Sequence, residues 1–148
     1  MSLFNSMNVS ASGLTAQRLR MDVISQNMAN VNTTRTANGT PYKRQTVVFE
    51  EAASSPFSMH LDNAMSSEQL GKGVRVSGIV TDPTPGIMVY DPSHPHADEN
   101  GYLEMPNVNI VEEMVNMISA SRSYEANITA MNVTRSMISK TLEISASR

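Results

Sequence analysis

Histidine and carboxylate side chains gather in one short phrase, where metal chemistry would first be sought. The segment HPHADE holds His94, His96, Asp98 and Glu99, and the remaining histidine is His60. A two-residue histidine spacing suits a metal ion only on an extended segment, and a third or fourth ligand is needed. Because the phrase is interrupted by proline, it is more typical of a polar loop in solvent. We therefore expect neither a metal nor a cofactor here.

Other patterns of catalytic chemistry are missing from the sequence. The phrases GKG and SGLTAQR lack the spacing of a phosphate-binding loop, and no nucleophile and base can be paired by motif. The chain has no cysteine, which excludes disulfides, thiol catalysis and cysteine metal ligands. We predict a protein that is not an enzyme and has no small-molecule substrate. The competing hypothesis, a metal enzyme using His94, His96 and Asp98, would be decided by metal analysis and substitution of both histidines.

Composition limits the possible partners. The chain has 148 residues, of which 40% are hydrophobic and 5% aromatic, with 12 methionines, no tryptophan and a net charge of -3. No strongly basic patch is present, so nucleic acid is not an expected partner. No apolar run of about 18 residues exists to span a membrane. The first residues lack the basic and apolar regions of a cleaved signal peptide.

Residues 3–31 are predicted to form a helix. They contain no proline and one glycine, Gly13, and their apolar residues follow a heptad pattern interrupted at Ser10 and Gln17. The expected apolar seam consists of Met7, Leu14, Met21, Ile24, Met28 and Val31.

Residues 109–142 are predicted to form a second, longer helix. They contain neither proline nor glycine, and Ser121 and Arg135 interrupt an apolar line with steps of four and three. Asn109 is placed to cap this helix, and Glu112 follows three residues later. The expected seam consists of Ile110, Met114, Met117, Tyr124, Ile128, Met131, Ile138 and Leu142.

The middle of the chain differs in composition from the two predicted helices. All seven prolines lie between Pro41 and Pro106. RQTVVFEE and VRVSGIVTD are typical of strands, residues 87–90 of a third strand, and a turn-rich loop follows. Residues 54–72 are polar and irregular. We expect a mainly α fold in which residues 1–36 and 107–148 form a discontinuous coiled-coil domain and residues 37–106 a β-rich insertion.

A two-helix hairpin leaves each apolar seam half covered, so further helices must supply the rest. Only Arg18, Arg20 and Asp22 are charged in the first 34 residues, whereas a solvated coiled coil normally carries many charges. The short polar side chains there allow close approach on several sides and are weak helix formers. We favour a subunit that orders on assembly over a single-chain hairpin.

Two asparagine-rich phrases flank the middle region. NMANVNTTRTANG (27–39) spans the end of the first predicted helix, and PNVN (106–109) leads into the second. Asparagine and threonine can satisfy exposed backbone groups with short side chains. We expect both phrases at the same end of the hairpin, as a junction made of Asn27, Asn30, Asn32, Thr33, Asn107 and Asn109.

The phrase GLTAQRLRMDVISQNMANVNTTRT resembles the N-terminal signature of bacterial flagellar axial proteins, the rod and hook group. The matching positions are Gln17, Arg18, Asn27, Ala29, Asn30, Asn32 and Thr33. The second half of the chain is similar to the C type of proximal-rod proteins. That similarity rests on HP at 94–95, ADENGY at 97–102, PNVN at 106–109, EEM at 112–114 and SRSYEAN at 121–127. His96 departs from this family, which more often has an acidic residue there.

The resemblance implies a structural subunit of the flagellar basal-body rod, which crosses the periplasm and transmits motor torque. It implies self-assembly with other rod proteins, contact with the rod–MS-ring adaptor, and passage through the flagellar type III export apparatus without a cleaved signal. The terminal helices would line the rod, with the β-rich insertion outside. The alternative is a soluble intracellular coiled-coil adaptor, which would form a stable, helical small oligomer in dilute solution.

Overall fold

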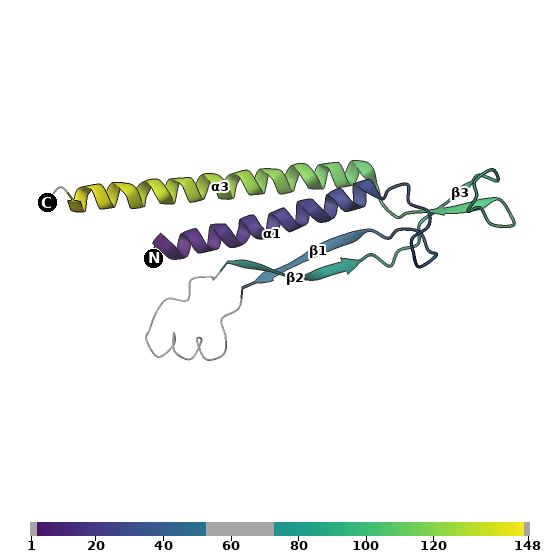
Figure 1. The fold of residues 1–148 in the computed structure, drawn as a ribbon, viewed down its shortest axis with the longest axis horizontal. Helices are drawn as coiled ribbons and strands as arrows, with labels where there is room; N and C mark the ends of the chain where they lie inside the picture. Colours follow the sequence, from purple (N-terminus) through teal and green to yellow (C-terminus); the bar gives the residue numbers. More distant parts are fainter. Residues whose placement is uncertain (1–2, 53–72, 147–148) are drawn as a thin grey trace, which may run out of the picture. The chain divides into compact units, whose positions relative to one another are not determined.

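A computed structural model describes residues 3–52 and 73–146 (Figure 1). Helix α1 (Leu3–Ala29) and helix α3 (Ile110–Ala146) stand at the two ends of the described chain. Between them lie the strands β1 (Gln45–Glu51), β2 (Val74–Thr81), β3 (Ile87–Tyr90) and β4 (Tyr102–Met105). The prediction of two long terminal helices around a small β-rich region is confirmed. The expectation for residues 54–72 falls outside the described residues.

The ends of the helices follow local chemistry. The side chain of Asn109 accepts hydrogen bonds from the backbone N–H groups of Val111 at 3.0 Å and Glu112 at 3.4 Å, so it caps α3. Helix α1 ends at Ala29, and the backbone N–H of Asn30 still donates to Gln26 O at 3.1 Å. Both caps satisfy backbone groups that a helix leaves unpaired at its ends.

The chain divides into two compact units. Unit 1 comprises Met1–Arg18, Phe49–Ser77 and Ser121–Arg148, and unit 2 comprises Leu19–Val48 and Gly78–Ala120. Each unit therefore contains part of both helices and part of the two-stranded sheet formed by β1 and β2.

In unit 2 the end of α1 lies beside the beginning of α3. Arg20 donates to the side chain of Asn116 at 3.4 Å, and Asn27 donates to Glu113 at 2.9 Å. Because the residue numbers rise along α1 as they fall along α3, the two helix segments run antiparallel. The buried apolar residues of this unit are Val23, Ile24, Val47, Leu103 and Ala120.

Unit 2 also contains an antiparallel hairpin, β3 with β4, in which Ile87 is paired with Met105 and Tyr90 with Tyr102. The sequence predicted β3 and missed β4, which was assigned to the loop that follows. Gly101 has a φ of 77° and its carbonyl accepts the Asp91 N–H at 2.9 Å, so a left-handed turn brings the chain back. A four-residue strand that begins directly after a turn is too short for its own alternation to reveal it.

Unit 1 contains close approaches at small residues. A Cβ at Gly13 would lie 3.1 Å from the amide of Asn127, so the absence of a side chain lets α1 and α3 approach each other. At the preceding residue of α1, the Val74 N–H donates to the Ser12 hydroxyl at 3.1 Å. Small residues thus set the spacing between α1 and its neighbours in this unit.

A line of buried and half-buried residues runs along one side of α3, and we call it the covered line. It differs from the predicted apolar seam at every second position. Buried or half-buried residues follow one another with steps of four and three: Glu113, Met117, Ala120, Tyr124, Asn127, Met131, Thr134 and Ile138. Four of these belong to the predicted seam. The other four are Glu113, Ala120, Asn127 and Thr134, which are acidic, small or polar. Each lies one residue before the position expected in the seam, which is Met114, Ser121, Ile128 or Arg135.

Candidate functional site

The junction of unit 2 is built around Asn27, whose side chain is 1% exposed. Its Nδ2 donates to Gln45 O at 2.8 Å and to Glu113 Oε2 at 2.9 Å. Its Oδ1 accepts from Gln45 N at 3.0 Å and from the Tyr42 hydroxyl at 2.9 Å. A buried polar group without partners costs about 1–3 kcal/mol, so this complete set of bonds allows an amide to occupy a core position.

Glu113 supplies a buried negative charge beside Asn27. The residue is 1% exposed, and its Oε1 accepts from Arg44 Nε at 2.8 Å. Arg44 also binds the exposed carboxylate of Glu112 at 3.1 Å. A buried carboxylate is tolerated when it is paired and hydrogen-bonded, and Arg44 and Asn27 together satisfy both of its oxygens.

The electrostatics of the network favour the charged form of Arg44 and the neutral form of Tyr42. Burial opposes the charge of Arg44, but the hydrogen bond and the charge of Glu113 outweigh it and raise the pKa of the guanidinium. Burial also raises the pKa of the Tyr42 phenol, and the negative charge of Glu113 raises it further. Tyr42 therefore remains a hydrogen-bond donor to Asn27 at neutral pH.

Asn107 connects the second asparagine-rich phrase to this network. Its Oδ1 accepts the backbone N–H of Arg44 at 2.7 Å, and its Nδ2 donates to Thr84 O at 3.0 Å. Arg44 thus binds Asn107 through its backbone and Glu113 through its side chain. The structure brings the two phrases together with the residues that lead into β1.

The other predicted junction residues make more local contacts. Asn30 donates to Gln26 O at 2.9 Å and accepts from the Thr33 hydroxyl at 3.1 Å. The carbonyl of Thr33 accepts the backbone N–H of Tyr42 at 3.0 Å, which turns the outgoing chain back toward the network. Asn32 is exposed, and Asn109 caps α3.

Sequence reasoning missed Tyr42, Arg44, Gln45 and Glu113 as junction residues. Glu113 enters the sequence analysis only within the EEM motif, although an acid on the covered line of an amphipathic helix signals a buried partner. Arg44, the first residue of the predicted strand RQTVVFEE, was the available cation. Their pairing joins positions far apart in the chain, and no local pattern encodes it.

The predicted seam residues are unequally covered. In α1, Ile24 is buried, whereas Met7, Leu14, Met21 and Met28 are half-buried, as is Val31 beyond the end of the helix. In α3, Met117, Tyr124, Met131 and Ile138 are half-buried, while Ile110, Met114, Ile128 and Leu142 are 45%, 50%, 38% and 64% exposed. Met28 meets Met114 and Met117 at an open groove of unit 2. That these residues form an assembly interface stays a prediction.

The histidine phrase forms an ordered loop. The backbone N–H of His96 donates to His94 Nδ1 at 3.1 Å, and the Thr34 hydroxyl lies 3.0 Å from His96 Nδ1. Asp98 and Glu99 are exposed. Within residues 3–52 and 73–146, no three or more His, Asp or Glu side chains are grouped to hold a metal ion. Over the same residues, no helix is both long and apolar enough to cross a membrane.

Two protein families match the helical parts of the chain. Residues 7–35 match the family described as flagella basal body rod protein. Residues 99–144 match the family described as flagellar basal body rod FlgEFG protein C-terminal. The first match contains most of α1 and the turn after it, and the second contains β4 and most of α3. Together they define the class: a structural protein of the flagellar basal-body rod.

Relatives cover nearly the whole chain. The flagellar basal-body rod protein FlgC of Borreliella burgdorferi is 50% identical, over 97% of this chain and 98% of its own length. FlgC of Bacillus subtilis is 50% identical over 97% and 99%, and FlgC of Salmonella typhimurium is 40% identical over 97% and 98%. The chain belongs to the FlgC family of flagellar basal-body rod proteins.

Family membership confirms three predictions from the sequence. The protein is a structural subunit of the bacterial flagellar basal-body rod, it is not an enzyme, and it resembles the axial proteins because it is one of their family. As a rod protein it assembles with other components of the flagellum.

Proposed function

We propose that this chain is a proximal-rod subunit in which α1 and α3 pair as an antiparallel coiled coil. Residues 1–36 with 107–148 form this assembly domain, and residues 37–106 form the insertion outside it. The antiparallel contacts of Arg20 with Asn116 and of Asn27 with Glu113 in unit 2 support the pairing. The close approach of Gly13 to Asn127 supports it in unit 1.

The observation that carries this proposal is an apolar surface on α3 that the described residues leave uncovered. In unit 2, Val111, Met114, Val115 and Ile118 are between 50% and 65% exposed. The covered line of the same helix instead uses Glu113, Ala120, Asn127 and Thr134. Exposed apolar patches mark surfaces that bind other proteins. The pairing within one chain therefore uses small and polar residues and leaves apolar ones for neighbouring subunits.

The junction has a mechanical role in this proposal. The network of Asn27, Arg44, Asn107 and Glu113 ties the chain entering β1 to both helices, so it fixes the angle at which the insertion leaves the assembly domain. Repeated in every subunit, this connection would transmit torque between the helical tube and the outer part of the rod.

The proposed partners are other rod proteins, further copies of this chain, the rod–MS-ring adaptor and the flagellar type III export apparatus. In this proposal the subunit lies in the part of the flagellum that crosses the periplasm. Support comes from family membership and from the many weak helix formers of α1, which suit a chain that orders on assembly.

A proline in the middle of α3 tests the helical assembly. Ile128→Pro removes a backbone hydrogen bond and costs a helix interior about 3 kcal/mol or more, so we expect no rod and no motility. Motility assays and electron microscopy of isolated basal bodies measure the effect. Ile128→Leu, which keeps the helix and the apolar side chain, is the matched control and should remain motile. Motile cells carrying Ile128→Pro would contradict the proposal.

A further inference from the structure

A turn that follows the end of α1 contains an Asn–Gly dipeptide at residues 38–39. The Gly39 N–H donates to Thr36 O at 2.9 Å, and Thr36 donates to Thr40 O from its backbone N–H and from its hydroxyl, both at 2.8 Å. Gly39 has a φ of 78°, is exposed, and has nothing within 4 Å of an added Cβ. This dipeptide therefore lies in solvent, in a turn closed by its own hydrogen bonds.

A second turn repeats this geometry between β3 and β4, around the Asn–Gly dipeptide at residues 100–101. The Gly101 N–H donates to Asp98 O at 2.9 Å, and the Asp98 N–H donates to Tyr102 O at 2.8 Å. Gly101 has a φ of 77°, but it is buried, and its carbonyl accepts the Asp91 N–H at 2.9 Å. The two turns thus have matching backbone hydrogen bonds and differ in how the glycine is held.

An Asn–Gly dipeptide can undergo a reaction with its own backbone. The glycine nitrogen loses its proton and attacks Cγ of the asparagine, the bond from Cγ to the side-chain nitrogen breaks, and ammonia leaves. Water then adds to one of the two carbonyls of the succinimide ring and reopens it as aspartate or isoaspartate. The sum consumes water and releases ammonia without oxidation or reduction. Glycine favours the attack because it has no side chain to shield its nitrogen.

The glycine nitrogen must first leave its hydrogen bond, so the reaction requires the turn to open. Exposed loops open at a lower free energy than backbone packed inside a folded unit, and residues 37–40 are all exposed. Gly101 is held by its neighbours, since a Cβ there would lie 2.9 Å from the Tyr90 ring and 3.2 Å from Pro92. Opening its turn would also disturb the pairing of Tyr90 with Tyr102. The fold therefore protects the second dipeptide more than the first.

Charge along the chain favours the same dipeptide. The attacking nitrogen is an anion, which a nearby positive charge stabilises and a nearby negative charge disfavours. Arg35 lies three residues before Asn38, and the residue directly before Asn38 is an uncharged alanine. Asp98 and Glu99 directly precede Asn100. Both charge and access therefore favour reaction at Asn38.

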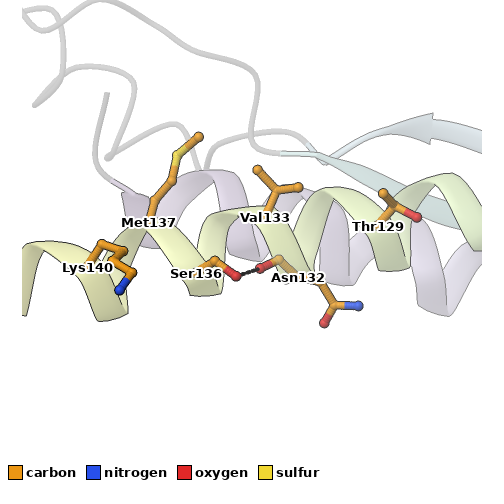
Figure 2. Close-up of a pocket in the computed structure, with 6 residues that line it drawn as sticks. All are labelled: Thr129, Asn132, Val133, Ser136, Met137 and Lys140. Atoms are coloured by element: carbon orange, nitrogen blue, oxygen red, sulfur yellow. Dashed lines mark hydrogen bonds between the residues drawn. The ribbon is translucent and has the colours of Figure 1, made fainter.

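Exposure alone does not make an asparagine reactive. Asn132 is exposed on α3, and Figure 2 shows its side chain projecting away from the helix. Its backbone carbonyl accepts the Ser136 hydroxyl at 3.0 Å, which is the dashed line in Figure 2. The next residue, Val133, has a branched side chain, and its backbone nitrogen lies inside the helix. Asn132 is therefore an exposed but unreactive reference.

We propose that Asn38 is a site of spontaneous deamidation in the folded subunit, and that the matching turn protects Asn100. The product carries a new negative charge at residue 38, and isoaspartate also lengthens the backbone of the turn by one carbon atom. The Tyr42 N–H donates to Thr33 O at 3.0 Å across the base of this turn. The reaction therefore changes the chain between α1 and β1, and it does not depend on which proteins the subunit contacts.

Mass spectrometry of intact basal bodies tests the proposal, because the full-length chain is assembled there. Basal bodies are incubated in mildly alkaline buffer made with heavy-oxygen water, and peptides containing Asn38, Asn100 and Asn132 are quantified over time. The added water leaves a heavy oxygen atom in the new carboxyl group, which distinguishes this reaction from earlier damage. We expect Asn38 to react at least about tenfold faster than Asn100, and Asn132 to remain unlabelled.

The chain unfolded in urea is the control for the fold. Both turns are lost there, so Asn38 and Asn100 should react within about threefold of each other, with only the charge of the neighbouring residues separating them. Asn38→Gln is the matched variant, because it keeps an amide but would have to form a larger ring. It should abolish labelling at residue 38 and leave the rate at Asn100 unchanged.

Three results would contradict the proposal. The first is an equal rate at Asn38 and Asn100 in basal bodies, and the second is an absence of label at Asn38. The third is a tenfold difference that persists in urea, since the protection of Asn100 would then come from its neighbours in sequence and not from the fold.

Discussion

At the scale of single residues, the junction depends on groups that are costly when unpaired. Asn27 and Glu113 are almost completely buried, and each supplies a partner to the other at 2.9 Å. Arg44, which lies outside both helices, donates a hydrogen bond to the other carboxylate oxygen of Glu113. Polar networks of this kind contribute specificity of geometry more than net stability, since a half-satisfied network is worse than an apolar one.

The first prediction concerns the Arg44–Glu113 pair. Arg44→Leu leaves the buried carboxylate of Glu113 uncompensated and should lower the free energy of unfolding by about 3–5 kcal/mol. The double variant Arg44→Leu/Glu113→Leu should lose less than the sum of the single variants, by about 1–3 kcal/mol. Urea unfolding followed by circular dichroism completes the cycle. Arg122→Ala, an exposed arginine of α3, is the control and should change stability by about 0.5 kcal/mol at most. Strict additivity would show that the pair is not coupled.

The second prediction concerns the Tyr42 phenol at high pH. Its pKa is raised above the ordinary value of 10.0 by burial and by Glu113, so the folded state holds this proton more tightly than the unfolded state. The resulting stability is fully present below the unfolded pKa and is lost as pH rises through the folded pKa. Tyr42→Phe removes this dependence, so the stability difference between wild type and variant should shrink above about pH 10. Urea midpoints measured from neutral to alkaline pH test this, and a constant difference would contradict it.

At the scale of elements, sequence patterns located the helices but not the side on which they meet. Apolar residues lie both on the covered line of α3 and on the predicted seam beside it. Met117, Tyr124 and Met131 belong to both lines, so they do not distinguish between them. The choice follows size: Ala120 is fully buried, and a Cβ at Gly13 would lie 3.1 Å from the Asn127 amide. Close helix contacts favour small residues, a requirement that a count of apolar residues does not capture.

The strands and the junction illustrate the same limit. β1, β2 and β3 carry runs of β-branched and apolar residues that single sequences reveal, and β4 with four residues does not. The asparagine-rich phrases were recognisable locally. Their partner Arg44 comes from the insertion and their partner Glu113 from α3, and such pairing is a property of the folded chain.

The third prediction compares two glycines with left-handed backbones. Gly73 has a φ of 98°, and a Cβ there would overlap the Ser12 hydroxyl of α1. Gly39 has a φ of 78° with nothing within 4 Å of an added Cβ. Both alanine variants carry a backbone strain of about 1–2 kcal/mol, but Gly73→Ala must also displace Ser12 from Val74. Thermal unfolding should show Gly73→Ala as the less stable variant, and equal melting temperatures would contradict the close approach.

At the scale of the whole molecule, the small and polar surface between the helices differs from the exposed apolar surface of α3. Small and polar residues of the two helices lie close together within each unit, and we propose that the junction orients the insertion. The exposed apolar residues of α3 are left over in both units. In a member of the FlgC family of rod proteins, we propose that these residues become the contacts between subunits.

Cysteine labelling before and after assembly tests this central claim most directly. Val111→Cys and Val115→Cys replace residues that are 65% and 62% exposed, and Ala120→Cys replaces one that is 0% exposed. The first two should react rapidly with a thiol reagent in the isolated chain and at least about tenfold more slowly in intact basal bodies, as expected for a buried interface. The Ala120 variant should react slowly in both. Equal labelling of the Val111 and Val115 variants in the isolated chain and in intact basal bodies would contradict the account.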